Sequence, residues 1–126
     1  MAKTLLVVDD AAIIREIIKD AATEAGWTAV GEAENGQEAV EQYEKLQPDV
    51  VTLDLVMPEY DGRHALRGIA KLDPKAKVVV VSALDQKDVL KEAFTLGASD
   101  FLVKPFDKQN LIDMIQALVP DVEPTG

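Results

Sequence analysis

Residues 49–58 read Asp49-Val50-Val51-Thr52-Leu53-Asp54-Leu55-Val56-Met57-Pro58, an apolar run that carries a carboxylate and is closed by a proline. A short run of Val and Leu that does not alternate with polar residues is typical of a strand buried on both faces of a parallel sheet. Asp54 then falls at the carboxyl end of that strand, where open α/β sheets place ligands and reactive groups. An aspartate there can be a nucleophile, a metal ligand or a turn former, and the ends of the other strands decide among these roles.

The rest of the chain alternates between apolar runs and amphipathic stretches. Strict alternation of strand and helix predicts βαβ units, a parallel sheet and right-handed crossovers. The expected fold is therefore α/β, a doubly wound five-stranded parallel sheet with five helices. Besides the central run, the expected strands cover residues 4–8, 28–33, 77–81 and 99–103. The expected helices cover about residues 12–25, 36–46 and 85–96, with two more that begin at residues 61–62 and 107.

Apolar residues at helical spacing predict which face of each helix is buried. In the first helix the predicted inward residues are Ile14, Ile17, Ile18, Ala21 and Ala25. In the fourth helix they are Val89, Ala93 and Phe94. Gly26 and Gly97 follow these two helices and are expected to end them.

The composition limits the kinds of function that the chain can perform. At 126 residues it is long enough for one domain with a single core, and its formal net charge is −10. Nucleic-acid binding requires a basic face, so this charge argues against direct contact with nucleic acid. The sequence contains no cysteine, which fits a reducing compartment such as the cytoplasm. No signal-peptide pattern is present and no apolar run approaches the roughly 18 residues of a membrane helix, so membrane insertion is not expected.

Polar residues stand at the carboxyl ends of four expected strands. Asp9 and Asp10 follow the first strand, Asp54 ends the third, Ser82 follows the fourth and Lys104 follows the fifth. In a parallel sheet these ends share one edge, so three carboxylates, a hydroxyl and an ammonium would share one crevice. Each residue taken alone has a simpler role, such as a helix N-cap for Asp10 or a solvated side chain for Lys104. Their coincidence at consecutive strand ends favours a common site.

The chemistry of such a crevice follows from its charges. Three close carboxylates repel one another, so they need a cation or raised pKa values. Oxygen-only ligation favours Mg²⁺, which takes one or two carboxylates, waters and phosphate oxygens. Lys104 and Ser82 add the donors that the outer oxygens of a phosphoryl group require. Asp54 is then a nucleophile toward phosphorus and forms an aspartyl phosphate.

With these residues in place, the chain resembles a receiver domain of a two-component response regulator, most closely the single-domain chemotaxis type. The resemblance covers about residues 4–119. Its matching features are Val7-Val8-Asp9-Asp10, Asp54-Leu-Val-Met-Pro58 followed by Asp61-Gly62, Ser82-Ala83, and Gly97-Ala-Ser-Asp-Phe-Leu-Val-Lys104-Pro105. It implies a flavodoxin-like sheet with strand order 2-1-3-4-5. It also implies a receiver domain over residues 1–119 and a polar C-terminal tail over residues 120–126.

The resemblance implies a metal set and a phosphoacceptor. Asp54 would accept the phosphoryl group. Asp10 and Asp54 would give carboxylates to Mg²⁺, the backbone carbonyl of Val56 would be a further ligand, and Asp9 would act through the metal's water shell.

It also implies residues that bind and report the phosphoryl group. Lys104 would pair with phosphoryl oxygens, Ser82 would donate a hydrogen bond to one of them, and the small Ala83 would leave room beside them. Phe101 matches the aromatic position that switches with phosphorylation, a role compatible with packing in the core. The peptide bond before Pro105 would be cis, which would aim Lys104 inward.

The implied partners are proteins. A histidine kinase would donate the phosphoryl group, and a downstream target would bind the face formed by the fourth helix, fifth strand and fifth helix, with Lys91, Met114 and Gln116 as candidate surface positions. The chemistry of the chain itself would be limited to self-phosphorylation and self-dephosphorylation, without a conventional enzyme activity. His64 is expected to be a solvated residue away from the crevice, and Tyr60 an exposed residue in a loop beside it.

Four alternatives remain open. A haloacid-dehalogenase-type phosphatase also uses a strand-end Asp and Mg²⁺, but it carries a second Asp two positions on, where this chain has Val56, which cannot do acid–base work. A nucleotide-binding module would need a glycine-rich loop after the first strand, where the chain has Asp9-Asp10-Ala11-Ala12. A receiver that acts as a scaffold would usually lack the acceptor Asp or the Lys. A phosphate sink or relay would keep the same site with a different partner.

Overall fold

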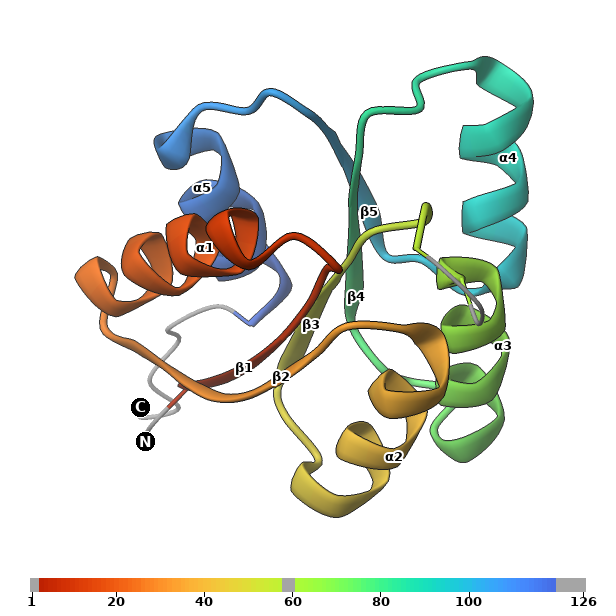
Figure 1. Cartoon of the computed structure of the whole chain (residues 1–126), viewed down its shortest axis with the longest axis horizontal. Helices are drawn as coiled ribbons and strands as arrows, with labels where there is room; N and C mark the ends of the chain where they lie inside the picture. Colours follow the sequence, from red (N-terminus) through yellow and green to blue (C-terminus); the bar gives the residue numbers. More distant parts are fainter. Residues whose placement is uncertain (1–2, 58–60, 120–126) are drawn as a thin grey trace, which may run out of the picture.

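The computed structural model describes residues 3–57 and 61–119. In this part of the chain strands and helices alternate throughout (Figure 1). The strands are β1 (Lys3–Val8), β2 (Trp27–Ala33), β3 (Val50–Leu53), β4 (Val78–Ser82) and β5 (Asp100–Val103). The helices are α1 (Ala12–Glu24), α2 (Gly36–Leu46), α3 (Gly62–Leu72), α4 (Lys87–Leu96) and α5 (Lys108–Leu118). The expected tail over residues 120–126 and the exposed position of Tyr60 lie outside the described residues.

All strands pair in parallel to form one five-stranded sheet with the order β2-β1-β3-β4-β5, which confirms the expected fold. The central strand β3 is buried along its whole length, as its apolar sequence predicts. In the pairing of β1 with β3, Val8 lies opposite Leu53. The next residues, Asp9 and Asp54, therefore leave the sheet side by side.

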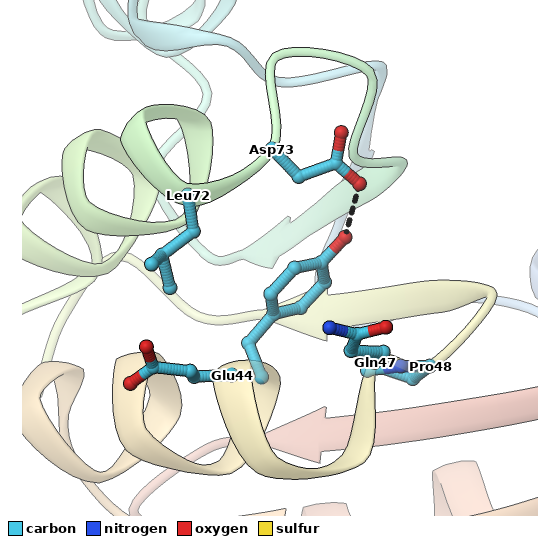
Figure 2. Close-up of a pocket in the computed structure, with 6 residues that line it drawn as sticks. Glu44, Gln47, Pro48, Leu72 and Asp73 are labelled. Atoms are coloured by element: carbon cyan, nitrogen blue, oxygen red, sulfur yellow. Dashed lines mark hydrogen bonds between the residues drawn. The ribbon is translucent and has the colours of Figure 1, made fainter.

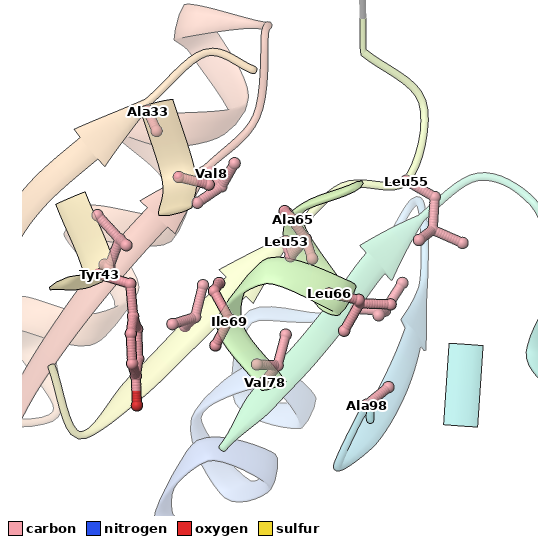
Figure 3. Close-up of a cluster of buried hydrophobic side chains, with 14 of the residues drawn as sticks. Val8, Ala33, Tyr43, Leu53, Leu55, Ala65, Leu66, Ile69, Val78 and Ala98 are labelled. Atoms are coloured by element: carbon pink, nitrogen blue, oxygen red, sulfur yellow. The ribbon is translucent and has the colours of Figure 1, made fainter. Parts of the chain in front are cut away.

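Helices cover both faces of the sheet (Figure 1). On one face, α1 and α5 enclose an apolar cluster that includes Leu5, Ile18, Trp27 and Leu111. On the other face, α2, α3 and α4 enclose a second cluster, in which β1 and β3 side chains meet those of α2 and α3 (Figure 3). Burial on two faces explains why the core strands read as continuous Val and Leu runs.

Two predicted core residues are instead exposed. Ile17 is 43% exposed and Phe94 is 46% exposed. The inward stripe of α4 consists of Val89, Ala93 and Leu96, which recur at i, i+4 and i+7. Phe94 follows Ala93 by one residue, about 100° around the helix, and therefore falls outside the stripe. In α1 the buried residues are Ile18, Ala21 and Ala22. Ile17 precedes Ile18 by one residue and therefore lies on the flank of this buried stripe.

Glycines end two of the helices, and a polar side chain caps the start of a third. Gly26 and Gly97 have φ angles of 89° and 120°, which favour glycine, and they follow α1 and α4. The Asn35 side chain caps α2 by accepting a hydrogen bond from the Glu38 N–H at 2.9 Å. Asp107 stands at the N-cap of α5, but its side chain makes no capping hydrogen bond to any described residue.

Among residues 3–57 and 61–119, no helix combines the length and the apolar character that a membrane crossing requires.

Candidate functional site

Three carboxylates meet at the carboxyl edge of the sheet, as the sequence predicts. Asp9, Asp10 and Asp54 each offer an oxygen that lies within 4.8 Å of the others. Asp9 and Asp54 are 1% and 6% exposed, whereas Asp10 faces solvent. The N-cap of α1 is Ala11 rather than Asp10, so Asp10 is not the N-cap of this helix.

Lys104 reaches the same place from β5. Its Nζ lies 2.7 Å from Asp9 Oδ2 and 3.1 Å from Asp54 Oδ2. The Lys104 N–H donates to the Ser82 carbonyl at 2.8 Å, which anchors the residue beside the end of β4. The Lys104–Pro105 peptide bond is cis, as expected. One ammonium therefore bridges two buried carboxylates from different strands.

Backbone groups fix the orientation of both buried carboxylates. Asp9 Oδ1 accepts from the Ala11 N–H at 2.9 Å, and Asp54 Oδ1 accepts from the Val56 N–H at 3.1 Å. The Asp54 N–H donates to the Val8 carbonyl at 3.0 Å. The two side chains are thus held before any ligand arrives, which lowers the cost of ordering them on binding.

The charges of the site are unbalanced. Burial raises the pKa of Asp54; the Val56 N–H and Lys104 oppose this effect, and the negative charge of Asp9 adds to it. Burial lowers the pKa of Lys104, but its hydrogen bonds and charge contacts with Asp9 and Asp54 outweigh burial and leave that pKa raised. With Asp10 included, three carboxylates face one ammonium, an excess of negative charge that favours a bound cation.

The donor set fits Mg²⁺. All three clustered groups offer oxygen, the ligand that hard divalent cations prefer, and Asp10 is accessible from solvent. Mg²⁺ usually takes only one or two protein carboxylates and keeps several waters, which suits a crevice open on one side. Val56, the predicted backbone ligand, borders the crevice with its side chain 56% exposed.

The remaining predicted residues lie close by. Ser82 ends β4 and is fully buried, and its Oγ accepts a hydrogen bond from the Leu84 N–H at 3.3 Å. Ala83 is exposed. Phe101 lies in β5 opposite Val80 of β4. It is half-buried and packs against the cluster under α2, α3 and α4.

Two contacts that shape the site were not identified from the sequence, although Gly62 was among the residues that carry the family resemblance. Gly62 opens α3, and a Cβ atom there would collide with the Asp54 carbonyl oxygen and lie 2.6 Å from Leu55 Cα. Glycine directly after the capping Asp61 is the only sequence signal for this close approach. Arg15 donates to the Asp9 carbonyl oxygen at 2.7 Å, and nothing in its local sequence marks that contact.

A second hollow lies away from these groups. Tyr43, Glu44, Gln47, Pro48, Leu72 and Asp73 line a pocket of about 460 Å³ (Figure 2). These residues follow α2 and α3 or end them, so the pocket lies at the amino edge of β3 and β4. It holds none of the strand-end carboxylates.

Comparison with known proteins gives a consistent result. Residues 5–116 match the family described as the response regulator receiver domain. The chain is 48% identical to the chemotaxis protein CheY of Thermotoga maritima, over 91% of this chain and 96% of that protein. It is 44% identical to CheY of Bacillus subtilis over the same shares. A crystal structure of a CheX–CheY–BeF₃–Mg²⁺ complex from Borrelia burgdorferi matches with a TM-score of 0.90 and 31% identity, over 93% of this chain and 89% of that one.

Proposed function

This chain belongs to the response regulator receiver domain family, and from that premise we propose that it is a chemotaxis-type response regulator that accepts a phosphoryl group on Asp54. Receiver domains of this type are signalling proteins rather than conventional enzymes. The observation that carries the proposal is the contact of Lys104 with Asp9 and Asp54 beside Asp10, which joins strand ends 95 and 50 residues apart. The receiver unit would occupy residues 1–119.

Phosphoryl transfer uses each of these groups. The bond between phosphorus and the donor nitrogen of a histidine kinase breaks, and a bond between phosphorus and an Asp54 carboxylate oxygen forms. Asp54 must be ionised to attack, and the neighbouring Val56 N–H and Lys104 favour that form. Mg²⁺, held by Asp10, Asp54 and the Val56 carbonyl with Asp9 in its water shell, would neutralise charge on the phosphoryl oxygens.

Lys104 and Ser82 respond to the new charge. The Lys104 ammonium, already between the two buried carboxylates, is placed to pair with a phosphoryl oxygen. Ser82 would turn its hydroxyl from the Leu84 N–H toward another oxygen, and Ala83 would leave space for it. Such a rearrangement needs two states with different affinity for the phosphoryl group, and the half-buried Phe101 is the aromatic residue able to change with them.

The proposed target-binding face combines α4, β5 and α5. Lys87, Leu90, Lys91, Phe94 and Thr95 line a hollow of about 590 Å³ along α4, and Phe94 contributes exposed apolar surface there. Met114, a candidate surface position, is half-buried and packs against the cluster under α1 and α5, so it offers less free surface than expected. Lys91 is exposed and Gln116 is half-buried.

Other uses of the same site differ in partner rather than in chemistry. A phosphate sink or relay would keep the Asp54 centre and lack a target for the α4 face. A phosphatase would need a general acid where Val56 stands, and an exposed valine cannot provide one. A receiver fed by a histidine kinase would work in the cytoplasm, where the kinase obtains ATP.

Intact-mass spectrometry after treatment with acetyl phosphate and Mg²⁺ tests the proposal. Wild type should gain one phosphoryl group, and Asp54→Asn or wild type with a chelator should gain none. Phosphorylation of Asp54→Asn to the wild-type extent would contradict the assignment of Asp54.

A further inference from the structure

Arg15 ties the metal-binding turn to a neighbouring strand. From α1, its Nη1 donates to the Asp9 carbonyl oxygen at 2.7 Å, and its Nε donates to Glu32 Oε1 on β2 at 2.8 Å. Lys19, one helical turn further on, holds the other Glu32 oxygen at 2.7 Å. The Arg15 side chain is only 14% exposed, whereas Glu32 is 38% exposed, so the contact with the Asp9 carbonyl is the better shielded half of this link.

The carbonyl that Arg15 holds belongs to the peptide group joining Asp9 to Asp10. This group is planar and rigid, so fixing its oxygen fixes the direction in which the backbone leaves toward Asp10. The Asp9 N–H is fixed as well, since it donates to the Ala33 carbonyl at 3.1 Å. Asp10 itself faces solvent, so its placement depends on the backbone that carries it.

We propose that Arg15, braced by Glu32, is a positioning residue for the cation site, which sets the Asp9–Asp10 turn in the geometry that binds Mg²⁺. This inference rests on the proposed function, because it concerns the same metal site. Partners that hold metal ligands in place typically contribute roughly 10- to 100-fold to metal affinity. Arg15 acts on backbone rather than on a ligand atom, so we expect an effect near the lower limit.

The positioning role and simple electrostatics predict opposite results. A guanidinium close to a cation site repels the cation, so its removal by Arg15→Gln should strengthen Mg²⁺ binding if charge alone matters. Positioning predicts weaker binding. Arg15→Lys keeps the charge but lacks the planar fork that reaches both oxygens, so positioning again predicts weaker binding while charge predicts no change.

Two further variants separate the remaining causes. Arg15→Gln combined with Glu32→Gln keeps the net charge of the wild type but removes the link. Arg63→Gln is the matched control, because Arg63 Nε also binds a carboxylate on another element, Glu92 Oε1 at 2.6 Å, without holding the Asp9 carbonyl. Thermal melting followed by circular dichroism establishes that each variant is folded.

The experiment titrates MgCl₂ into the full chain by isothermal calorimetry. The dissociation constant for Mg²⁺ should rise roughly 10-fold in Arg15→Gln, in Arg15→Lys and in the double variant, and stay within about twofold in Arg63→Gln. The half-saturating Mg²⁺ concentration for phosphorylation by acetyl phosphate should rise by the same factor. At saturating Mg²⁺, the rate of phosphorylation of the Arg15 variants should return to about the wild-type value.

Each outcome decides between supporting and rejecting the role of Arg15. Equal or tighter binding in Arg15→Gln overturns the positioning role while leaving the proposed function intact. If Arg15→Gln fails to fold, the charge-conserving Arg15→Lys decides, and unchanged affinity in it overturns the inference. A wild type that binds no Mg²⁺ overturns the proposed metal site and this inference together.

Discussion

The Asp54 carboxylate lies between two opposing influences. Burial raises its pKa, while the Val56 N–H and Lys104 stabilise the ionised form, which the proposed attack on phosphorus requires. The protein therefore keeps a carboxylate in an environment that disfavours its charge. Reactive groups often occupy such environments. Such a site should cost stability when no ligand is bound.

Asp54→Asn should stabilise the ligand-free protein at neutral pH. Because the pKa of Asp54 is higher in the folded protein, its favourable contribution is complete below the unfolded pKa of about 4 and is lost as pH rises through the folded value. Asparagine removes the charge and leaves Lys104 its contact with Asp9. We expect a gain on the order of 1 kcal/mol, or about 4 °C in melting temperature, that shrinks below about pH 4. Equal melting temperatures at all pH values would contradict this cause.

Val56 and Leu84 should lengthen the life of the aspartyl phosphate. They stand two residues after Asp54 and Ser82, and Val56 is 56% exposed beside the site. Neither apolar side chain can hydrogen-bond an attacking water or place it in line with the phosphorus–oxygen bond. The variant Val56→Asn with Leu84→Glu adds such groups, and one hydrogen bond worth about 1 kcal/mol corresponds to roughly fivefold faster decay. Decay of the aspartyl phosphate is measured after the phosphodonor is removed. If the double variant decays no faster than wild type, the positioning of water does not limit hydrolysis.

The site residues were predictable because each stands at a strand end, where sequence position and spatial position coincide. Parallel register brings the strand ends that precede Asp9, Asp54 and Lys104 to one edge of the sheet. Arg15 and Gly62 were not predictable, because their roles depend on a long side chain crossing to Asp9 and on the distance between α3 and Asp54. Neither distance is set by local periodicity.

At the scale of secondary structure elements, the N-terminus of α3 lies directly against the backbone of Asp54 and Leu55. The Gly62 N–H donates to the Leu55 carbonyl at 3.0 Å, and its missing side chain lets α3 begin directly against the Asp54 backbone. α3 thereby supports the backbone that follows Asp54, the proposed phosphoacceptor.

Gly62→Ala should destabilise the protein although alanine favours helices. Helix propensity alone would give about 1 kcal/mol of stabilisation, whereas the clash with Asp54 and Leu55 backbone should cost about 1–3 kcal/mol. Gly68→Ala in the same helix is the control, because the nearest atoms to its Cβ belong to the Val40 side chain rather than to backbone, with Val40 Cγ2 at 2.5 Å. Urea unfolding measures both. If Gly62→Ala were more stable than wild type, or if both variants lost the same free energy of unfolding, the close approach of α3 to Asp54 would not explain the need for glycine at position 62.

A hydrogen bond links α2 to the residue that follows α3. The Tyr43 hydroxyl donates to Asp73 Oδ2 at 2.9 Å beside the pocket of Figure 2, and burial together with Asp73 raises the pKa of Tyr43 to about 12. Tyr43→Phe should lose about 1 kcal/mol of unfolding free energy. The wild-type advantage should be complete below the unfolded pKa of about 10 and disappear as pH rises through about 12. Ultraviolet titration should lose its late phenolate step in Tyr43→Phe, and an unchanged late step would assign it to another tyrosine.

Periodicity predicted which segments form helices and which form strands. It predicted less well where each segment begins and ends and which apolar residues beside the buried stripe are exposed. β4 extends to Ser82 and α4 begins at Lys87, two residues later than expected. The exposed faces of Ile17 and Phe94 reflect tertiary placement, because a helix that packs along a narrow stripe leaves flanking apolar residues in solvent. The exposure of Phe94 matters for function, since it lies on the proposed target-binding face.

At the scale of the whole molecule, the sheet joins the reactive edge to that face. β4 and β5 pair through Ser82 and Val103, and β5 carries both Phe101 and the chain leading to Lys104. Ser82 and Lys104 both lie at the carboxyl end of β5, so a change at either residue acts on the same end of this short strand. In the chain, α4 connects β4 to β5 and α5 follows β5, so the proposed target-binding face adjoins this strand pair (Figure 1).

The central claim is that a phosphoryl group on Asp54, held with Mg²⁺, changes the α4–β5–α5 surface. Amide NMR spectra recorded before and after addition of beryllofluoride, a phosphoryl mimic, with Mg²⁺ test it directly. The account predicts shifts at Asp9, Asp54 and Lys104 together with shifts along α4 and α5, and neither set in Asp54→Asn. Shifts confined to the immediate neighbours of Asp54 would contradict it.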